Sequence, residues 1–169
     1  MLVLKIVIYS FIFLSSSLIG ILISKKYTNR VNELKEFKNA LNIFKTKIRY
    51  TYEPIPEIFM EISSSVNPSI SNVFSIASEK MDLLTAGEAW SIALKMEDLN
   101  INNEDKMALN NLSKLLGKTD LQGQLGQIEM TEDFLEEQIK KAEKEKNKNE
   151  KLYRTLGMIL GLTIVIILM

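Results

Sequence analysis

The chain has 169 residues, which is enough for one domain of ordinary size, and its 21 basic and 21 acidic side chains give a net charge of zero. Such a balance gives no reason to expect nucleic acid as a partner, because phosphate binding requires a surplus of Lys and Arg on one face. The sequence contains neither Cys nor His. Their absence removes disulfides, thiolate nucleophiles, most zinc sites and the usual general base, so we expect no enzyme, no metal and no cofactor.

The first hydrophobic segment is residues 6–24, which contain no charged side chain. A helix of about 20 apolar residues spans the hydrocarbon core of a bilayer, so we predict a transmembrane helix here and place residues 1–5 outside the cytoplasm. The alternative is a cleavable signal peptide, whose apolar region usually has about 7–15 residues. The apolar run continues beyond the serines at 15–17, which favours a retained anchor.

The second hydrophobic segment is residues 155–169, with the sequence TLGMILGLTIVIILM. At 1.5 Å per residue, about 15 residues reach only ~22 Å of the ~30 Å hydrocarbon core. Leu152 and Tyr153 extend the segment if Arg154 reaches outward to the interface. A buried core helix is the alternative, but such a helix normally has a polar side and this run has none. We therefore predict a second transmembrane helix.

The orientation follows from basic residues, which flank both segments on the side of the middle of the chain. They are Lys25, Lys26, Arg30, Lys35, Lys38, Lys140, Lys141, Lys144, Lys146, Lys148, Lys151 and Arg154. Because loops rich in Lys and Arg stay in the cytoplasm, we predict that the middle domain is cytoplasmic.

Both hydrophobic segments carry small residues four positions apart. These are Ser16 and Gly20 in the first segment, and Gly157 and Gly161 in the second. Small residues at this spacing let two helix backbones approach closely within a membrane. Packing of the two segments against each other and formation of a homo-oligomer both fit the pattern.

Residues 25–139 show helical periodicity and no alternation typical of strands, which predicts an all-α bundle of about six helices between the two transmembrane helices. Expected helix starts are Asn67 followed by Pro68, a capping box from Thr85 to Glu88, residues 100–103, and a second capping box from Thr119 to Gln122. Gly117 is expected to end the fifth helix. The expected core comprises Val31, Leu34, Phe37, Leu41, Phe44, Ile48, Ile58, Phe59, Ile62, Ile70, Val73, Phe74, Ala77, Met81, Ala89, Trp90, Ala93, Leu94, Met107, Leu109, Leu112, Leu115, Leu116, Leu121, Leu125, Ile128, Leu135, Ile139 and Ala142.

Residues 140–154 are polar on all sides, and no proline interrupts the chain from Asp120 onward. We predict a charged helical stalk that continues the last bundle helix into the second transmembrane helix. A helix without an apolar face can also be unstable, so a disordered hinge at residues 147–149 is the alternative.

Glu57 and Glu61 lie one turn apart and could place two carboxylates on one helix face. Paired carboxylates need partners and a desolvated pocket to bind metal or to act as acid and base. Without His or a Gly-rich loop nearby, a solvated helix face is the expected role. An enzyme that uses carboxylates alone is therefore the weakest of three functional hypotheses.

The order and spacing of several segments along the whole chain resemble one family, the stage III sporulation protein AB family of endospore-forming Firmicutes. The segments are Gly20-Ile-Leu-Ile-Ser-Lys-Lys-Tyr27, Ile48-Arg-Tyr-Thr-Tyr-Glu-Pro-Ile-Pro-Glu57, Glu88-Ala-Trp90, Leu116-Gly-Lys-Thr-Asp120 with Gln124, and Tyr153-Arg-Thr-Leu-Gly157. One departure is Lys47, where the family usually has an acidic residue, so a contact made by that position in the family is in doubt here.

The resemblance implies a domain similar to the cytoplasmic domain of type II secretion F proteins. It also implies a place in the mother-cell membrane around the forespore, within a sporulation complex. A secretion-type ATPase resembling stage III sporulation protein AA would be the partner, together with other members of that complex. The chain would then be a non-enzymatic platform.

The loops that resemble the family most closely provide the candidate partner-binding residues, because polar loops on a rigid bundle often bind partners. These residues are Tyr50, Pro54, Ile55, Pro56, Glu57, Leu116, Gly117, Lys118, Asp120 and Gln124. A purely structural role in turns and caps is the alternative for each. For the whole chain, the alternative is a membrane-anchored sensory bundle that transmits a signal through its stalk.

Overall fold

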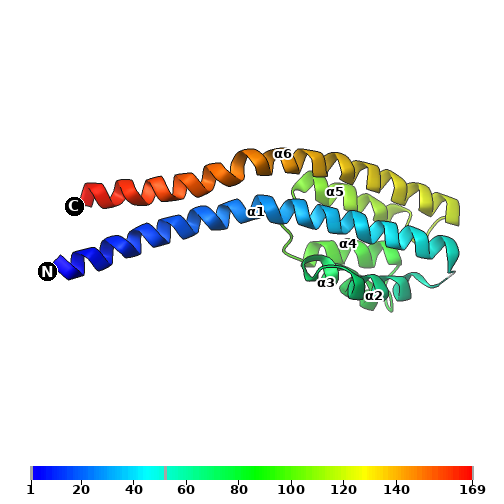
Figure 1. Cartoon of the computed structure of the whole chain (residues 1–169). Coiled ribbons are helices and arrows are strands. Elements are labelled where there is room, and N and C mark those ends of the chain that lie inside the picture. Colours follow the sequence, from blue (N-terminus) through cyan, green and yellow to red (C-terminus); the bar gives the residue numbers. More distant parts are fainter. Residues whose placement is uncertain (1, 52, 169) are drawn as a thin grey trace. The chain divides into compact units, whose positions relative to one another are not determined.

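The computed structural model describes residues 2–51 and 53–168, apart from the side chains of Leu2 and Val3. All regular structure in these residues is helical, which confirms the all-α prediction (Figure 1). The elements are α1 (Leu2–Tyr50), α2 (Ile55–Ser65), α3 (Pro68–Lys80), α4 (Ala86–Met96), α5 (Asn103–Asn111), a 3-10 turn η1 (Leu112–Lys114) and α6 (Leu121–Leu168).

The chain forms two compact units. One consists of residues up to Val31 together with those from Lys141 onward, and the other is Asn32–Lys140. The two long helices, α1 and α6, contribute to both units. A continuous α6 was predicted and is confirmed, including residues 147–149. The continuity of α1 was not predicted; the charged residues after position 24 change the polarity of this helix without ending it.

The unit Asn32–Lys140, called the bundle below, is organised around Trp90, which is fully buried. Phe37, Phe59 and Phe74 surround its indole with ring centroids 6.5, 5.6 and 5.3 Å away. The indole N–H donates a hydrogen bond of 2.8 Å to the carbonyl of Leu109. Because these residues come from α1, α2, α3, α4 and α5, one aromatic cluster connects most of the bundle.

Helix starts in the bundle follow local capping chemistry. The side chain of Asn67 accepts a 3.1 Å hydrogen bond from the Ser69 amide at the start of α3. At the start of α4, Thr85 and Glu88 form the predicted capping box. Asn102 opens α5 with a similar box. Each arrangement satisfies amides that would otherwise have no partner in the first turn.

The predicted capping box at Thr119 is wrong. Helix α6 begins at Leu121, and the Asp120 side chain accepts the Gly123 amide at 2.9 Å. Asp120 therefore occupies the cap position, one residue later than predicted. An aspartate caps at least as well as a threonine, and competition between adjacent candidates decides the boundary.

Several predicted core residues lie closer to the surface. Helix α5 ends at Asn111 and not at Gly117 as predicted. The buried residues Leu109, Leu112 and Leu116 recur every three or four positions, and Met107 and Leu115 lie off this stripe. Met107 is 70% exposed and Leu115 is 38% exposed. Ile48, Met81 and Leu121 are half-buried because each stands at or next to a helix end.

Candidate partner-binding site

The structure brings the two candidate loops together at one end of the bundle. A side-chain carbon placed on Gly117 would lie 3.8 Å from the Cδ1 of Ile55 and 3.3 Å from the Cβ of Ala86. Gly117 has a positive φ of 71°, a conformation that glycine adopts without strain. In Figure 1 the end of α1 and the beginning of α6 lie at this same end of the bundle.

Most candidate residues on these loops are accessible. Tyr50 is 70% exposed, and the other exposed members are Pro54, Glu57, Gly117, Lys118 and Asp120. Ile55, Pro56 and Gln124 are half-buried. Leu116 is only 2% exposed, so it supports the loop from inside the bundle and offers no surface to a partner. We call the exposed set, Tyr50, Pro54, Glu57, Gly117, Lys118 and Asp120, the loop surface.

Internal hydrogen bonds hold both loops in place. Pro54 has an extended conformation and precedes the first residue of α2, while the Ser78 hydroxyl donates a 2.8 Å hydrogen bond to the carbonyl of Pro56. On the other loop, the Gln124 side-chain amide donates to the carbonyl of Thr119 at 3.1 Å. These residues thus have structural roles as well, and the loop surface rests on a fixed backbone.

The charges near the loop surface are partly paired. The ammonium of Lys47 lies 2.6 Å from a carboxylate oxygen of Glu61 and 3.8 Å from one of Glu53. The hydrogen bond to Glu61 raises the pKa of Lys47. Lys47 therefore has ion-pair partners of its own in this chain. Glu61 is engaged with Lys47, and Glu57 remains an exposed carboxylate on the loop surface.

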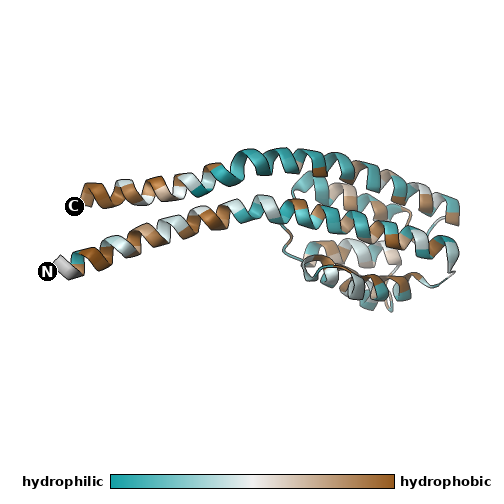
Figure 2. Ribbon diagram, in the orientation of Figure 1, coloured by the Kyte–Doolittle hydropathy of each residue, from teal (hydrophilic) through white to brown (hydrophobic). Residues whose placement is uncertain are grey.

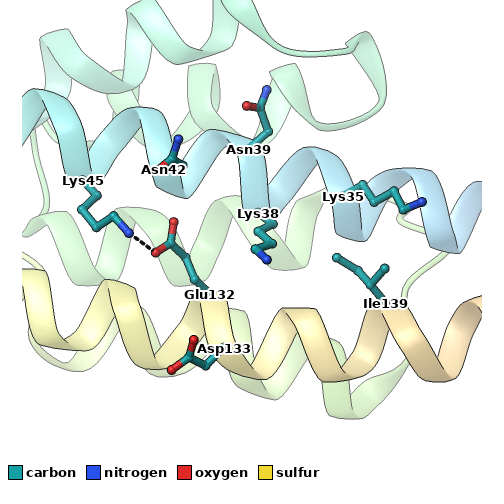
Figure 3. Close-up of a pocket in the computed structure, with 8 residues that line it drawn as sticks. All are labelled: Lys35, Lys38, Asn39, Asn42, Lys45, Glu132, Asp133 and Ile139. Carbon is teal, nitrogen blue, oxygen red and sulfur yellow. Dashed lines mark hydrogen bonds and ion pairs between the residues drawn. The ribbon is translucent and has the colours of Figure 1, made fainter.

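A groove on the bundle surface was not predicted from the sequence. It has a volume of about 460 Å³ and runs between α1 and α6 (Figure 3). Its lining residues are Lys35, Lys38, Asn39, Asn42, Lys45, Glu132, Asp133 and Ile139.

Ion pairs join α1 to α6 along this groove. Lys45 pairs with Glu132, Lys38 lies 2.8 Å from Glu136, and Arg49 lies 3.6 Å from Glu129. Hydrogen bonds from Lys38 and then Lys140 lower the pKa of Glu136 to about 2. In the sequence, the lysines of α1 and the glutamates of α6 each recur at intervals of three to seven residues. This pattern indicates ion pairs only once it is known that the two helices lie side by side.

Glu33 is a buried carboxylate that holds the loop between α4 and α5. It is 4% exposed and accepts hydrogen bonds from the backbone amide of Asn100 at 2.7 Å and from its side-chain amide at 2.6 Å. Burial raises the pKa of Glu33, while the two bonds from Asn100 act in the opposite direction.

This raised pKa predicts a pH effect on stability. At pH values between the unfolded and folded pKa values of Glu33, the folded state binds more protons than the unfolded state. The contribution of Glu33 to the stability of the fold is therefore largest at low pH and decreases as the pH rises. The free energy of unfolding of the wild type should therefore rise relative to that of Glu33→Gln when the pH is lowered from 7 to 4. Urea unfolding of the full chain in detergent, followed by the fluorescence of its single tryptophan, measures this. A difference that does not change with pH would contradict the assignment.

In the other unit, the backbones of α1 and α6 come close together at the small residues. A side-chain carbon on Gly20 would lie 2.6 Å from the Tyr153 carbonyl oxygen and 3.0 Å from the Cα of Gly157. The Ser16 hydroxyl donates a 2.7 Å hydrogen bond to the carbonyl of Gly157. A carbon on Gly161 would lie 3.1 Å from the Cβ of Ser16. All four predicted packing residues thus lie between these two helices.

Further contacts join α1 and α6 beyond Gly20 and Gly157, in the direction of the charged segments. The rings of Tyr27 and Tyr153 stack with centroids 5.7 Å apart. Arg30, which is 7% exposed, lies 2.7 Å from a carboxylate oxygen of Glu145. The packed region therefore extends from the small residues into the charged segments.

We predict that Gly20→Leu separates the two helices by roughly 2 Å, because the distance between packed helices depends on the side chains at the contact. Spin labels on cysteines introduced at Lys26 and Lys151, both exposed, would report this distance in the full chain. Leu18→Ala, at a residue that is 57% exposed, is the control and should leave it unchanged. Equal distances in both variants would show that Gly20 is not at the contact.

Comparison with known proteins places these features in a family. The sequence matches the model of the family described as "Stage III sporulation protein AB (spore_III_AB)" over residues 5–169, which is nearly its whole length. The chain belongs to the stage III sporulation protein AB family. Stage III sporulation protein AB of Bacillus subtilis (strain 168) is 27% identical over 163 residues, covering 94% of this chain and 95% of that protein.

The fold agrees with a solved structure of the family. Stage III sporulation protein AB (SpoIIIAB) matches with a TM-score of 0.66 at 23% sequence identity, over 70% of this chain and 96% of that chain. At this identity the similarity concerns the fold alone. The family match over residues 5–169 includes both loops of the loop surface and both terminal apolar segments.

Proposed function

We propose that the chain is a non-enzymatic, membrane-anchored platform of a sporulation complex. In this proposal residues 6–24 and 155–169 cross the mother-cell membrane around the forespore, and residues 1–5 lie outside the cytoplasm. The cytoplasmic helical domain, residues 25–139, and the stalk, residues 140–154, lie in the mother-cell cytoplasm. By length and composition α1 and α6 are both able to cross a membrane, and only 6% and 11% of their most apolar stretches are buried. Exposed apolar surface of this extent favours contact with lipid.

The partner in this proposal is a secretion-type ATPase that resembles stage III sporulation protein AA, and the loop surface is its binding site. The observation that carries the proposal is the meeting of two sequence-distant loops at one end of the bundle, beside Gly117. Six residues from these loops are exposed on a backbone held by internal hydrogen bonds. A fixed surface of this kind can bind a partner with little loss of conformational entropy.

The direct test is binding between the full chain in lipid nanodiscs and the AA-like ATPase of the same organism, with the nucleotide varied. We expect saturable binding that the double variant Glu57→Lys/Asp120→Lys weakens at least ten-fold. Asp98→Lys/Glu137→Lys, which makes the same charge change at exposed positions elsewhere on the bundle, should bind like the wild type. No binding in any nucleotide state would contradict the platform, and a bound small ligand in the bundle would favour a sensor.

A further inference from the structure

We propose that a hollow on α6 beside the second apolar segment binds the phosphodiester headgroup of an anionic phospholipid. The hollow has a volume of about 380 Å³ and is called the juxtamembrane hollow below. Its lining residues are Lys146, Asn147, Glu150, Lys151, Arg154, Thr155 and Met158. The platform proposal neither uses nor requires this site.

The electrostatics of the juxtamembrane hollow favour an anion. Three of the lining residues are basic and one is acidic. Lys146, Lys151 and Arg154 form no ion pair with any residue that the structure describes, in contrast to the lysines of the groove in Figure 3. The acidic member, Glu150, already accepts a hydrogen bond from the hydroxyl of Thr28 at 3.4 Å. The lining therefore has three basic groups against one carboxylate, a net positive charge.

The chemical groups suit a phosphodiester. The planar guanidinium of Arg154 can donate two parallel hydrogen bonds to phosphate oxygens, and the ammonium groups of Lys146 and Lys151 add point charges. Asn147 and Thr155 provide neutral donors from the same lining. Such a combination recognises a phosphate without requiring a particular substituent on it.

The position of the hollow identifies the source of that phosphate as lipid. Arg154 is the last charged residue before the apolar run, and Met158 brings an apolar wall into the same lining. In Figure 2 the colour of α6 changes from teal to brown along this stretch. A phospholipid has a phosphate next to glycerol and acyl chains, which matches a lining that is cationic at one end and apolar at the other. Basic residues at the cytoplasmic surface attract anionic lipids.

The inference rests on one part of the proposed function, namely that residues 155–169 lie in the membrane. The test uses the full chain in nanodiscs with equal parts of phosphatidylglycerol and phosphatidylcholine. Native mass spectrometry after gentle release then gives the ratio of the two lipids retained per chain. Each basic residue near a membrane contributes roughly a five-fold preference for anionic lipid, so we expect strong enrichment of phosphatidylglycerol on the wild type.

The variant Lys146→Gln/Lys151→Gln/Arg154→Gln should reduce the enrichment at least ten-fold. The matched control is Lys141→Gln/Lys144→Gln/Lys148→Gln, which removes the same charge from exposed positions of the same helix outside the hollow and should retain the enrichment. Because glutamine forms helices nearly as well as lysine and arginine, circular dichroism should show equal helicity in both.

Three results would overturn the inference. An equal loss of phosphatidylglycerol enrichment in both variants would indicate diffuse attraction of the lysines and arginine to the membrane surface. No enrichment on the wild type would show that there is no site. Displacement of the lipid by millimolar inorganic phosphate would show recognition of phosphate without lipid. Resistance of the chain to alkaline extraction from vesicles is measured in parallel. Extraction of the chain by alkali would contradict the transmembrane part of the proposed function, whereas the three results above would not.

Discussion

Gly87→Ala should destabilise the bundle strongly, at or above the upper end of the roughly 1–3 kcal/mol that overpacking typically costs. Gly87 is buried in the first turn of α4, and a side-chain carbon there would lie 2.1 Å from the Ser113 carbonyl oxygen. The obstructing atom belongs to the backbone of η1, so a rotamer change cannot relieve the clash. Either α4 or the turn must move, and Trp90 lies only three residues further along α4.

Urea unfolding of the full chain in detergent, followed by tryptophan fluorescence, would measure this effect. The matched control is Gly126→Ala in α6, where an added carbon meets nothing within 4 Å. At this exposed helical position alanine should stabilise the chain by about 0.5–1 kcal/mol. The same substitution is thus predicted to have opposite signs at the two sites. Stabilisation by Gly87→Ala would contradict the contact between α4 and η1.

Trp90→Ala should destabilise the bundle by about 3–5 kcal/mol, which is the usual cost of truncating a fully buried large aromatic residue. The substitution removes the ring that contacts Phe37, Phe59 and Phe74 and leaves a cavity between helices. It also removes the donor to the Leu109 carbonyl. We expect a large shift of the urea midpoint measured by circular dichroism.

Trp90→Phe separates the two contributions. Phenylalanine keeps most of the aromatic contacts but cannot donate a hydrogen bond, so its cost should be smaller, about 1–2 kcal/mol. The Leu109 carbonyl still accepts the Leu112 amide in this variant, which limits the penalty. A phenylalanine variant as unstable as the alanine variant would show that the hydrogen bond, and not packing, dominates at this position.

The fold could be predicted from local signals because they agree along the chain. The apolar stripe around Phe37 and Phe44, the proline after Asn67 and the capping box at Thr85 each determine a helix or its start without reference to distant residues. Both long charged segments continue as helix because no proline or glycine pair interrupts them. Local signals were sufficient to predict a helix or its start wherever the nearby sequence offered only one candidate.

The errors occurred where neighbouring residues compete. Thr119 and Asp120 can both cap α6, and in the structure Asp120 occupies the cap position. Met107 and Leu115 lie off the stripe formed by the buried residues Leu109, Leu112 and Leu116. An apolar residue beside a buried stripe can remain exposed, and its hydrophobicity alone does not assign it to the core.

The candidate site was less predictable than the fold. The two loops were recognised through their resemblance to a family, and their proximity depends on the path of the whole bundle. The groove with Lys45 and Glu132 requires the pairing of α1 with α6, which no local pattern specifies. Contacts between residues far apart in sequence lie beyond the range of capping and periodicity.

If the loop surface is the binding site, the bound ATPase covers it, and the accessibility of single cysteines measures this directly. Because the chain has no cysteine, a single cysteine introduced at Tyr50, which is 70% exposed, or at Met96, which is 59% exposed, gives a clean probe. Met96 is the last residue of α4, while Ala86 at its other end contacts the Gly117 loop. At 1.5 Å per residue, the two ends of α4 are about 15 Å apart.

Both single-cysteine chains are reconstituted in nanodiscs, and the rate of maleimide labelling is measured with and without the AA-like ATPase. We predict that the partner slows labelling at Tyr50→Cys at least ten-fold and leaves labelling at Met96→Cys unchanged. Bound ATPase with no protection at position 50, or with protection only at position 96, would contradict the loop surface as the binding site.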